Sequence, residues 1–141
     1  GVMATANNLL YEDDRYFILS NQWIPLMEKC TIQEKCKLGS LFDKLCGGGC
    51  IAHINVEGRF PNEETAWEML NYIADQGVTY FAFNTKIQAC KHNHAFYGKV
   101  CPECGEGVAT EYTRIVGFYT PIKTWSETRK EEYEMREWED V

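Results

Sequence analysis

Two short runs, Ile51-Ala52-His53-Ile54-Asn55-Val56 and Val78-Thr79-Tyr80-Phe81-Ala82-Phe83, are the clearest indication of architecture in this chain. The first alternates apolar and polar residues, and the second is rich in the β-branched and aromatic residues that strands favour. Between them, Asn62 can cap a helix that Gly77 closes. The apolar face of that helix is formed by Ala66, Met69, Leu70 and Ile73. Strand, helix and strand in this order predict an α/β fold with parallel strands.

Another helix is expected on the N-terminal side of these strands. Thr31 and Glu34 have the spacing of a capping box, in which hydroxyl and carboxylate each satisfy a free backbone N–H group. Apolar residues then recur at helical spacing until Gly47-Gly48-Gly49 stops the helix. They are Ile32, Leu38, Leu41, Phe42 and Leu45, and this helix is expected to include Cys36 and Cys46. Before it, residues 20–26 are expected to form a loop that ends in an apolar anchor.

Cysteine and histidine residues gather in the segment 90–105, which we call the metal knuckle. Cys101 and Cys104 are separated by two residues, a spacing at which two thiolates can bind one metal ion. Gly105 supplies the permissive backbone conformation that such a turn needs. This pair therefore predicts one half of a metal site, with the other half upstream.

Cys90 is the expected third ligand of this metal. His94 is the expected fourth, because three intervening residues leave room for the imidazole to turn back toward the ion. His92 is the alternative, although one intervening residue would make a strained chelate. Thiolates with one imidazole favour tetrahedral zinc, and four protein ligands leave no open position, so the predicted zinc site is structural.

Composition limits the classes of function. The 141 residues suit one domain of ordinary size, and the net charge of −7 argues against binding a nucleic-acid polymer. No apolar run is long enough to span a membrane, and the first residues lack the pattern of a signal peptide. Three of the seven cysteines have metal-type spacing, which suits a reducing compartment, so we expect the cytoplasm. No phosphate-binding loop is present.

The segment after the metal knuckle reads Thr113-Arg114-Ile115-Val116-Gly117-Phe118-Tyr119. Together with the knuckle, it resembles the C-terminal signature of the anaerobic (class III) ribonucleoside-triphosphate reductases, where a metal knuckle precedes Arg-[Val/Ile]-x-Gly-[Tyr/Phe]. The resemblance covers essentially the whole chain and is strongest over residues 47–121. Two departures are the atypical first half of the knuckle and a variable form of the tail at residues 124–127.

The resemblance implies that Gly117 is the catalytic residue and carries a stored radical. In that family a separate iron–sulfur activase cleaves S-adenosylmethionine to form the radical. The radical then oxidises an active-site cysteine to a thiyl, which attacks the ribose of a ribonucleoside triphosphate. Only glycine serves, because a side chain would hinder both the planar radical geometry and the approach of the activase.

The resemblance also implies a fragment. Residues 1–89 would be the C-terminal segment of the α/β barrel of a glycyl-radical enzyme, and residues 90–141 a zinc-knuckle and glycyl-radical domain with a charged tail. The thiyl cysteine and most of the ribonucleotide site would lie upstream, so the chain alone is expected to be inactive. The implied partners are the activase, the remainder of the reductase chain and a second copy in a homodimer.

Two other functions fit the same residues: a zinc-ribbon adaptor that binds protein without radical chemistry, and a free-standing spare glycyl-radical subunit. Cys30, Cys36, Cys46 and Cys50 belong to no recognisable motif, and we expect no redox role for them. His53 is expected to be a hydrogen-bonded histidine of the sheet. Acidic residues of the tail are expected to form a solvated face, and the tryptophans to serve packing or surface roles. These are Glu131, Glu132 and Glu134, with Trp67, Trp125 and Trp138.

Overall fold

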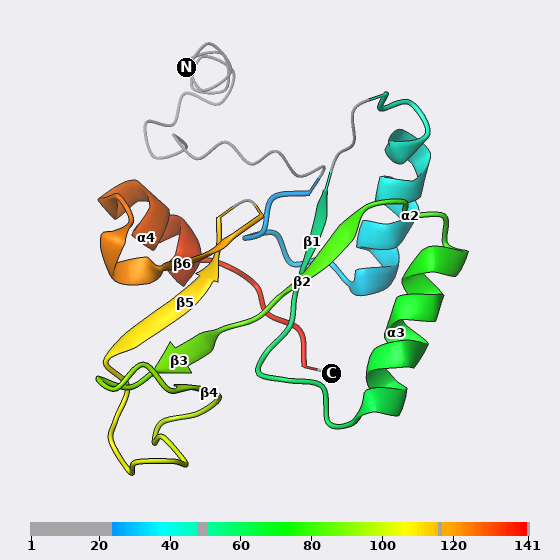
Figure 1. Cartoon of the computed structure of the whole chain (residues 1–141). Helices are drawn as coiled ribbons and strands as arrows, with labels where there is room; N and C mark the ends of the chain where they lie inside the picture. The colour runs from blue at the N-terminus through cyan, green and yellow to red at the C-terminus, as the bar shows by residue number, and fades with distance from the viewer. Residues whose placement is uncertain (1–23, 48–50, 116, 141) are drawn as a thin grey trace.

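A parallel β-α-β unit forms the first part of the molecule (Figure 1). The computed structural model describes residues 24–47, 51–115 and 117–140. Strand β1 (Ala52–Asn55) pairs in parallel with β2 (Phe81–Asn84), and α3 (Glu63–Asp75) is the crossover between them. The predicted parallel pairing is therefore confirmed. Asn62 caps α3 as expected, because its side chain accepts a hydrogen bond from the Thr65 N–H at 2.8 Å.

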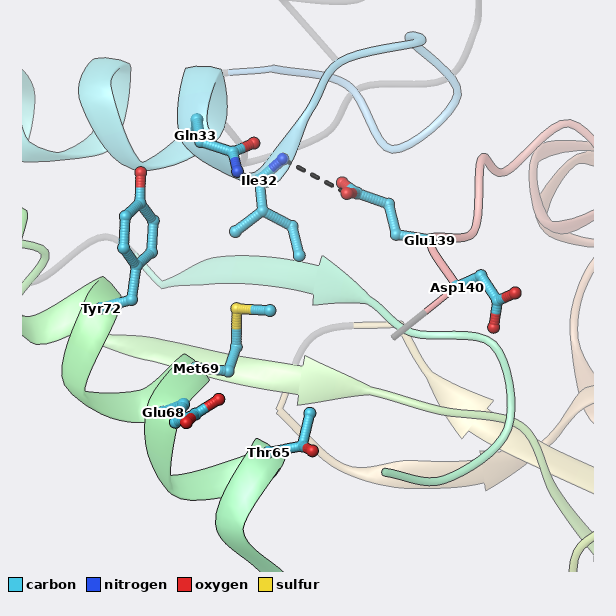
Figure 2. A pocket seen from close by; sticks show the side chains of 8 residues that line it. All are labelled: Ile32, Gln33, Thr65, Glu68, Met69, Tyr72, Glu139 and Asp140. Atoms are coloured by element: carbon cyan, nitrogen blue, oxygen red, sulfur yellow. Dashed lines mark hydrogen bonds between the residues drawn. The ribbon is translucent and has the colours of Figure 1, made fainter. Parts of the chain in front are cut away.

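Helix α2 (Ile32–Asp43) begins at the predicted capping box. Thr31 Oγ1 accepts from the Glu34 N–H at 3.2 Å, and Glu34 Oε2 accepts from the Thr31 N–H at 2.9 Å. The free N–H of Ile32 in the first turn donates to the carboxylate of Glu139, which comes from the far end of the chain (Figure 2). The first turn of α2 is thus an anchor for the C-terminal segment.

The end and the buried face of α2 differ from the prediction. The helix stops at Asp43, whose carboxylate accepts from the N–H and the hydroxyl of Thr79, so Cys46 lies beyond the helix. Leu41 and Leu45, expected on the apolar face, are 60% and 79% exposed. The buried positions are Ile32, Lys35, Cys36, Gly39 and Asp43. Gly39 lies against Val78, where an added Cβ would stand in ordinary van der Waals contact, 3.6 Å from the Val78 side chain.

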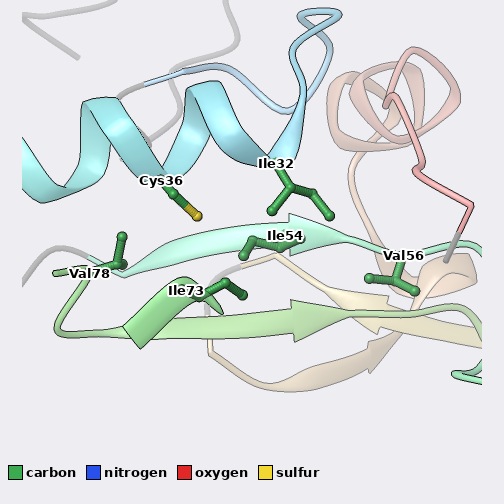
Figure 3. Close-up of a cluster of buried hydrophobic side chains, with 6 residues drawn as sticks. All are labelled: Ile32, Cys36, Ile54, Val56, Ile73 and Val78. Carbon is green, nitrogen blue, oxygen red and sulfur yellow. The ribbon is translucent and has the colours of Figure 1, made fainter. Parts of the chain in front are cut away.

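One apolar core joins α2, α3 and the parallel strands (Figure 3). Ile32 and Cys36 point from α2 toward Ile54 of β1, and Ile73 of α3 is completely buried. Ile73 was correctly predicted to lie on the apolar face of α3. Of that face it contributes most to the hydrophobic stabilisation of the core, because it has no exposed surface. Burial of these side chains fixes both helices against β1 and β2.

A four-stranded antiparallel sheet forms the second part, in the order β4-β3-β5-β6. Its strands are β3 (Ile87–Ala89), β4 (Ala95–Phe96), β5 (Thr110–Arg114) and β6 (Tyr119–Pro121). A 3-10 turn (Ile122–Thr124) and helix α4 (Glu127–Glu134) follow. Because β3 pairs with β5, the strand that leads to Gly117 lies beside the strand that leads to the metal knuckle.

The C-terminal segment, which was expected to be a charged tail with a solvated acidic face, is packed against the rest of the molecule. Trp125 is 6% exposed, and Glu132, expected on a solvated face, is 3% exposed. Glu132 is buried because both its carboxylate oxygens accept hydrogen bonds from Arg136, at 2.7 and 2.8 Å. Beyond α4 the chain returns to β1, where the Glu139 N–H donates to the Asn55 carbonyl at 3.1 Å.

The mixed α/β fold is confirmed by these elements, while the barrel stays a prediction about a longer chain. Within the described residues the parallel sheet has two strands. The division at residue 89 also stays a prediction; β3 ends at that residue and pairs with strands that follow it. Of the expected features, residues 20–23, Gly48, Gly49 and Cys50 lie outside the described residues. None of the described helices is long and apolar enough to cross a membrane.

Candidate metal centre and glycine loop

The structure brings together the four side chains that the sequence singled out as metal ligands. The ligand atoms of Cys90, His94, Cys101 and Cys104 all lie within 4.8 Å of one another. Cys90 Sγ is 3.6 Å from Cys104 Sγ, and Cys101 Sγ is 3.6 Å from His94 Nδ1. At usual zinc bond lengths, tetrahedral ligands lie about 3.8 Å apart for two sulfurs and about 3.6 Å for sulfur and nitrogen. The donor set and its spacing therefore fit a zinc ion.

Two tight turns produce this cluster. Asn93 has a φ of 64° and donates its N–H to the Cys90 carbonyl, so the chain reverses between β3 and β4 and returns His94 beside Cys90. Gly105 has a φ of 71° and donates its N–H to the Cys101 carbonyl, as the knuckle requires. Phe96 is 6% exposed and packs against the cysteines, which shields the cluster on its inner side.

His94 and His92 are distinguished by their positions. His94 directs Nδ1 toward the cluster, and its Nε2 lies 3.6 Å from the carboxylate of Glu103. A carboxylate beside the outer nitrogen favours the tautomer that leaves the inner nitrogen free to bind metal. His92 is exposed and is outside the group of ligand atoms that lie within reach of one another. The geometry therefore favours His94.

The thiols of the cluster influence one another's ionisation. The Glu106 N–H lowers the pKa of Cys104, but burial and hydrogen bonds with the neighbouring sulfurs of Cys101 and Cys90 raise it to about 11. Burial raises the pKa of Cys90, yet N–H groups of His94 and His92 outweigh that effect and bring it below the usual value. A bound cation would allow the neighbouring thiols to ionise together, because metal ligation deprotonates thiols.

The remaining described cysteines lack a comparable setting. Cys36 belongs to the apolar core, and burial raises its pKa. Burial and the Glu34 carboxylate raise the pKa of Cys30. A thiol whose pKa is raised is a poor nucleophile, so these positions give no support to a redox role.

Gly117 lies in the turn that joins β5 to β6, where Arg114 and Tyr119 are opposite each other. Gly117 is exposed, and its neighbour Phe118 is 81% exposed. A Cβ added at Gly117 would meet no atom within 4 Å, and its φ lies outside the left-handed region that favours glycine. Neither a close approach nor the φ of this residue explains the glycine.

A buried polar ladder, which was not predicted from the sequence, lies beneath this turn. Asn84 Nδ2 donates to Asn55 Oδ1 at 2.8 Å, and Asn84 Oδ1 accepts from the Thr113 hydroxyl at 2.8 Å and from the Arg114 N–H at 3.1 Å. Asn55 Nδ2 donates in turn to the Glu137 carbonyl at 2.9 Å. The ladder joins the parallel strands, the glycine turn and the C-terminal segment. An asparagine at the end of each parallel strand was its only signal in the sequence.

A hollow of about 420 Å³ lies between α2, α3 and the C-terminal segment (Figure 2). Met69 and Tyr72 form part of its apolar wall, and Glu139 and Asp140 lie at its rim. The carboxylate of Glu139 is already engaged by the Ile32 N–H and by Lys35, at 3.3 and 3.1 Å. Glu139 therefore anchors the C-terminal segment to α2.

These features define a mixed α/β domain with a Cys/His cluster that could hold a metal ion and with a solvent-exposed glycine turn. The chain belongs to the anaerobic ribonucleoside-triphosphate reductase family, whose model matches residues 3–138. The resemblance found in the sequence is thereby confirmed. No curated protein sequence matches the chain.

Solved structures of anaerobic ribonucleotide reductases share the fold. One is 41% identical with a TM-score of 0.87, and the match covers 99% of this chain and 23% of that chain. The Thermotoga maritima enzyme with MES in the active site is 42% identical with a TM-score of 0.76, over 88% of this chain and 21% of that one. Its complex with dATP and CTP is 41% identical with a TM-score of 0.74, and the match covers 95% of this chain and 22% of that chain. The chain thus spans less than a quarter of the length of these enzymes.

Proposed function

We propose that this chain is the C-terminal portion of an oxygen-sensitive ribonucleotide reductase and that Gly117 stores the radical used to reduce ribonucleoside triphosphates. The family assignment and the short coverage of the related enzymes support the role of a C-terminal portion. The observation that carries the proposal is that Gly117 is glycine without a packing or φ requirement for it. A chemical requirement accounts for the residue instead, because a Cα radical must be planar and reachable.

The same proposal assigns zinc to Cys90, His94, Cys101 and Cys104. Four protein ligands would leave the ion no open position, so its contribution is to stability and not to the reaction. The ion would join the β3–β4 turn to the turn at residues 101–105, which precedes β5. Since β3 pairs with β5, zinc at this site would stiffen the sheet that holds the glycine turn.

The proposed partners follow from what the chain contains. Residues outside the chain would supply the thiyl cysteine, most of the ribonucleotide site and the homodimer contact. An iron–sulfur activase that cleaves S-adenosylmethionine would remove a hydrogen from Gly117, and the exposure of Gly117 and Phe118 supports such an encounter. The proposal includes a cytoplasmic location, because the cytoplasm is a reducing compartment.

Oxygen-dependent cleavage tests the proposal. The full-length enzyme is activated anaerobically with its activase and S-adenosylmethionine, then exposed to air and analysed by denaturing mass spectrometry. Oxygen adds to a Cα radical and the product fragments the backbone, so we expect a cut at Gly117 and a piece that begins near Phe118. A protein that stays full-length in air would favour a zinc adaptor without radical chemistry.

Two glycine variants provide the comparison. Gly117→Ala should abolish the cut without disturbing the fold or zinc, because the added methyl group meets no atom within 4 Å. Gly107→Ala is the matched control, since a Cβ at Gly107 also meets nothing and its φ is also outside the left-handed region. That control should be cut like the wild type. Equal cutting of both variants would place the break elsewhere.

The cut pieces should stay together until they are denatured. Residues after Gly117 include β6, which pairs with β5, and Arg136, which donates to the Arg114 carbonyl at 2.8 Å. The Glu139 carboxylate also remains bound to Lys35. Native size-exclusion chromatography should therefore show one species where denaturing mass spectrometry shows two.

A further inference from the structure

Arg114 closes the turn that contains Gly117. It is the last residue of β5 and lies opposite Tyr119, the first residue of β6. Its side chain crosses the turn, where Nη1 donates a hydrogen bond to the Gly117 carbonyl at 2.9 Å. Its guanidinium carbon lies 4.5 Å from the centre of the Tyr119 ring, within the range of a cation–π contact. One side chain thus contacts both the glycine and the strand that follows it.

The backbone of Arg114 is held from both sides. Its N–H donates to Asn84 Oδ1 at 3.1 Å, and its carbonyl accepts from Arg136 Nη1 at 2.8 Å. Asn84 is completely buried, and Arg136 is bound by both carboxylate oxygens of Glu132. The point from which the Arg114 side chain extends is therefore fixed to two distant segments of the chain.

The grip of Arg114 on the turn depends on few contacts. Its Nε is buried and makes no hydrogen bond with the described residues. The side chain therefore holds the turn through the Nη1 bond and the Tyr119 ring. Loss of the Nη1 bond alone would free the Gly117 carbonyl.

We propose that Arg114 is a positioning residue for Gly117, which fixes the direction of the Gly117 carbonyl and places a permanent positive charge on it. The inference rests on the proposed function, because it concerns the two amide groups between which an unpaired electron on the Gly117 Cα would be shared. Those groups must lie in one plane with the Cα. A guanidinium stays charged at all relevant pH values, so it polarises the carbonyl constantly. A hydrogen bond to a charged donor is also stronger than one to a neutral donor.

The first test needs no radical and uses a unique feature of the sequence. Gly117-Phe118 is the only Gly-Phe pair in the chain, so carbonyl-¹³C glycine with ¹⁵N phenylalanine gives one NMR cross-peak for this peptide bond. Arg114→Gln keeps most of the stem but ends two bonds short of Nη1. We expect the Gly117 carbonyl carbon to shift upfield in this variant, because it loses its hydrogen bond. Arg114→Lys, which retains a charged donor, should restore part of the shift.

A matched control comes from Arg59, an exposed arginine between β1 and α3. Arg59→Gln should leave the cross-peak in place. A carbonyl resonance that is unchanged in a folded Arg114→Gln protein would overturn the inference. If Arg114→Gln fails to fold, Arg114→Lys is compared with Arg114→Ala. The inference is supported if the Gly117 carbonyl resonance shifts upfield in both variants and shifts less in Arg114→Lys. Equal shifts in those two variants would contradict it.

The second test uses electron paramagnetic resonance on the activated full-length enzyme. Arg114→Gln should lower the yield of the glycyl signal by about tenfold or more, as expected for one hydrogen bond to a charged group. Arg59→Gln should match the wild type, and zinc content should be equal in all three. Equal signals in wild type and Arg114→Gln would refute the inference about Arg114 and leave the proposed function standing. Absence of any signal from the wild type would refute the proposed function, whatever the NMR experiment shows.

Discussion

Replacement of Asn84 by alanine should destabilise the fold strongly, because Asn84 connects three segments while having no exposed surface. Its amide nitrogen donates to Asn55 Oδ1, and its amide oxygen accepts from the Thr113 hydroxyl and the Arg114 N–H. Alanine would remove all three hydrogen bonds. The groups on the partner residues would remain in the interior without the bonds they now make.

The magnitude follows from that count. Each buried polar group left without a partner costs about 1–3 kcal/mol, and partial relaxation makes the costs less than additive. We expect a loss of about 3–5 kcal/mol in the free energy of unfolding, which is large against a usual total of about 5–15 kcal/mol. For a domain of this size such a loss lowers Tm by roughly 10 °C or more.

Urea unfolding followed by far-ultraviolet circular dichroism measures this loss. The matched control is Asn71→Ala, an asparagine exposed on α3, whose replacement should change stability by less than about 0.5 kcal/mol. A loss below about 1 kcal/mol for Asn84→Ala, with an unchanged m-value, would refute the view that the ladder holds the segments together.

Four further predictions concern the candidate metal centre and the extent of the chain. Elemental analysis should find one zinc per chain in the wild type and none in Cys101→Ser/Cys104→Ser, and full retention by that variant would refute the site. His94→Ala should lose zinc and His92→Ala should keep it; the reverse result would make His92 the ligand. Glu103→Gln should weaken zinc binding by about tenfold in a chelator competition, because it loosens the outer partner of the imidazole, and an unchanged affinity would contradict that role. The 141-residue chain alone, with activase and reductant, should reduce no ribonucleotide, and turnover would overturn the fragment assignment.

Local signals in the sequence predicted the elements that depend on neighbouring residues. The Thr31–Glu34 capping box and the Asn62 cap are hydrogen bonds between residues three apart, so their spacing is visible in the sequence. The gathering of the four expected metal ligands likewise depends on two short turns. The parallel pairing of β1 with β2 followed from the intervening helix.

Features that depend on distant contacts were not predictable in this way. Leu41 and Leu45 are apolar at helical spacing, yet they are exposed, and α2 directs Ile32 and Cys36 to the core because β1 and α3 lie against that face. Glu132 belongs to a charged stretch that resembles a solvated face. It is buried in a pair with Arg136, and Arg136 in turn reaches the Arg114 carbonyl, a contact across 22 positions that no local pattern encodes.

The polar ladder illustrates the same limit. Asn55 and Asn84 are the last residues of β1 and β2, a position where asparagine usually marks a turn. Only the parallel register places them opposite each other, and only the return of the C-terminal segment completes the ladder. Its position beneath Arg114 explains how the fold could hold the glycine turn.

Electron paramagnetic resonance of the activated full-length enzyme, prepared with ordinary glycine and with α-deuterated glycine, tests most directly whether Gly117 stores the radical. A radical on Gly117 keeps one α-hydrogen, so we expect a doublet that collapses to a narrow singlet on deuteration and is absent from Gly117→Ala. A signal unaffected by deuterated glycine, or one that persists in Gly117→Ala, would contradict it.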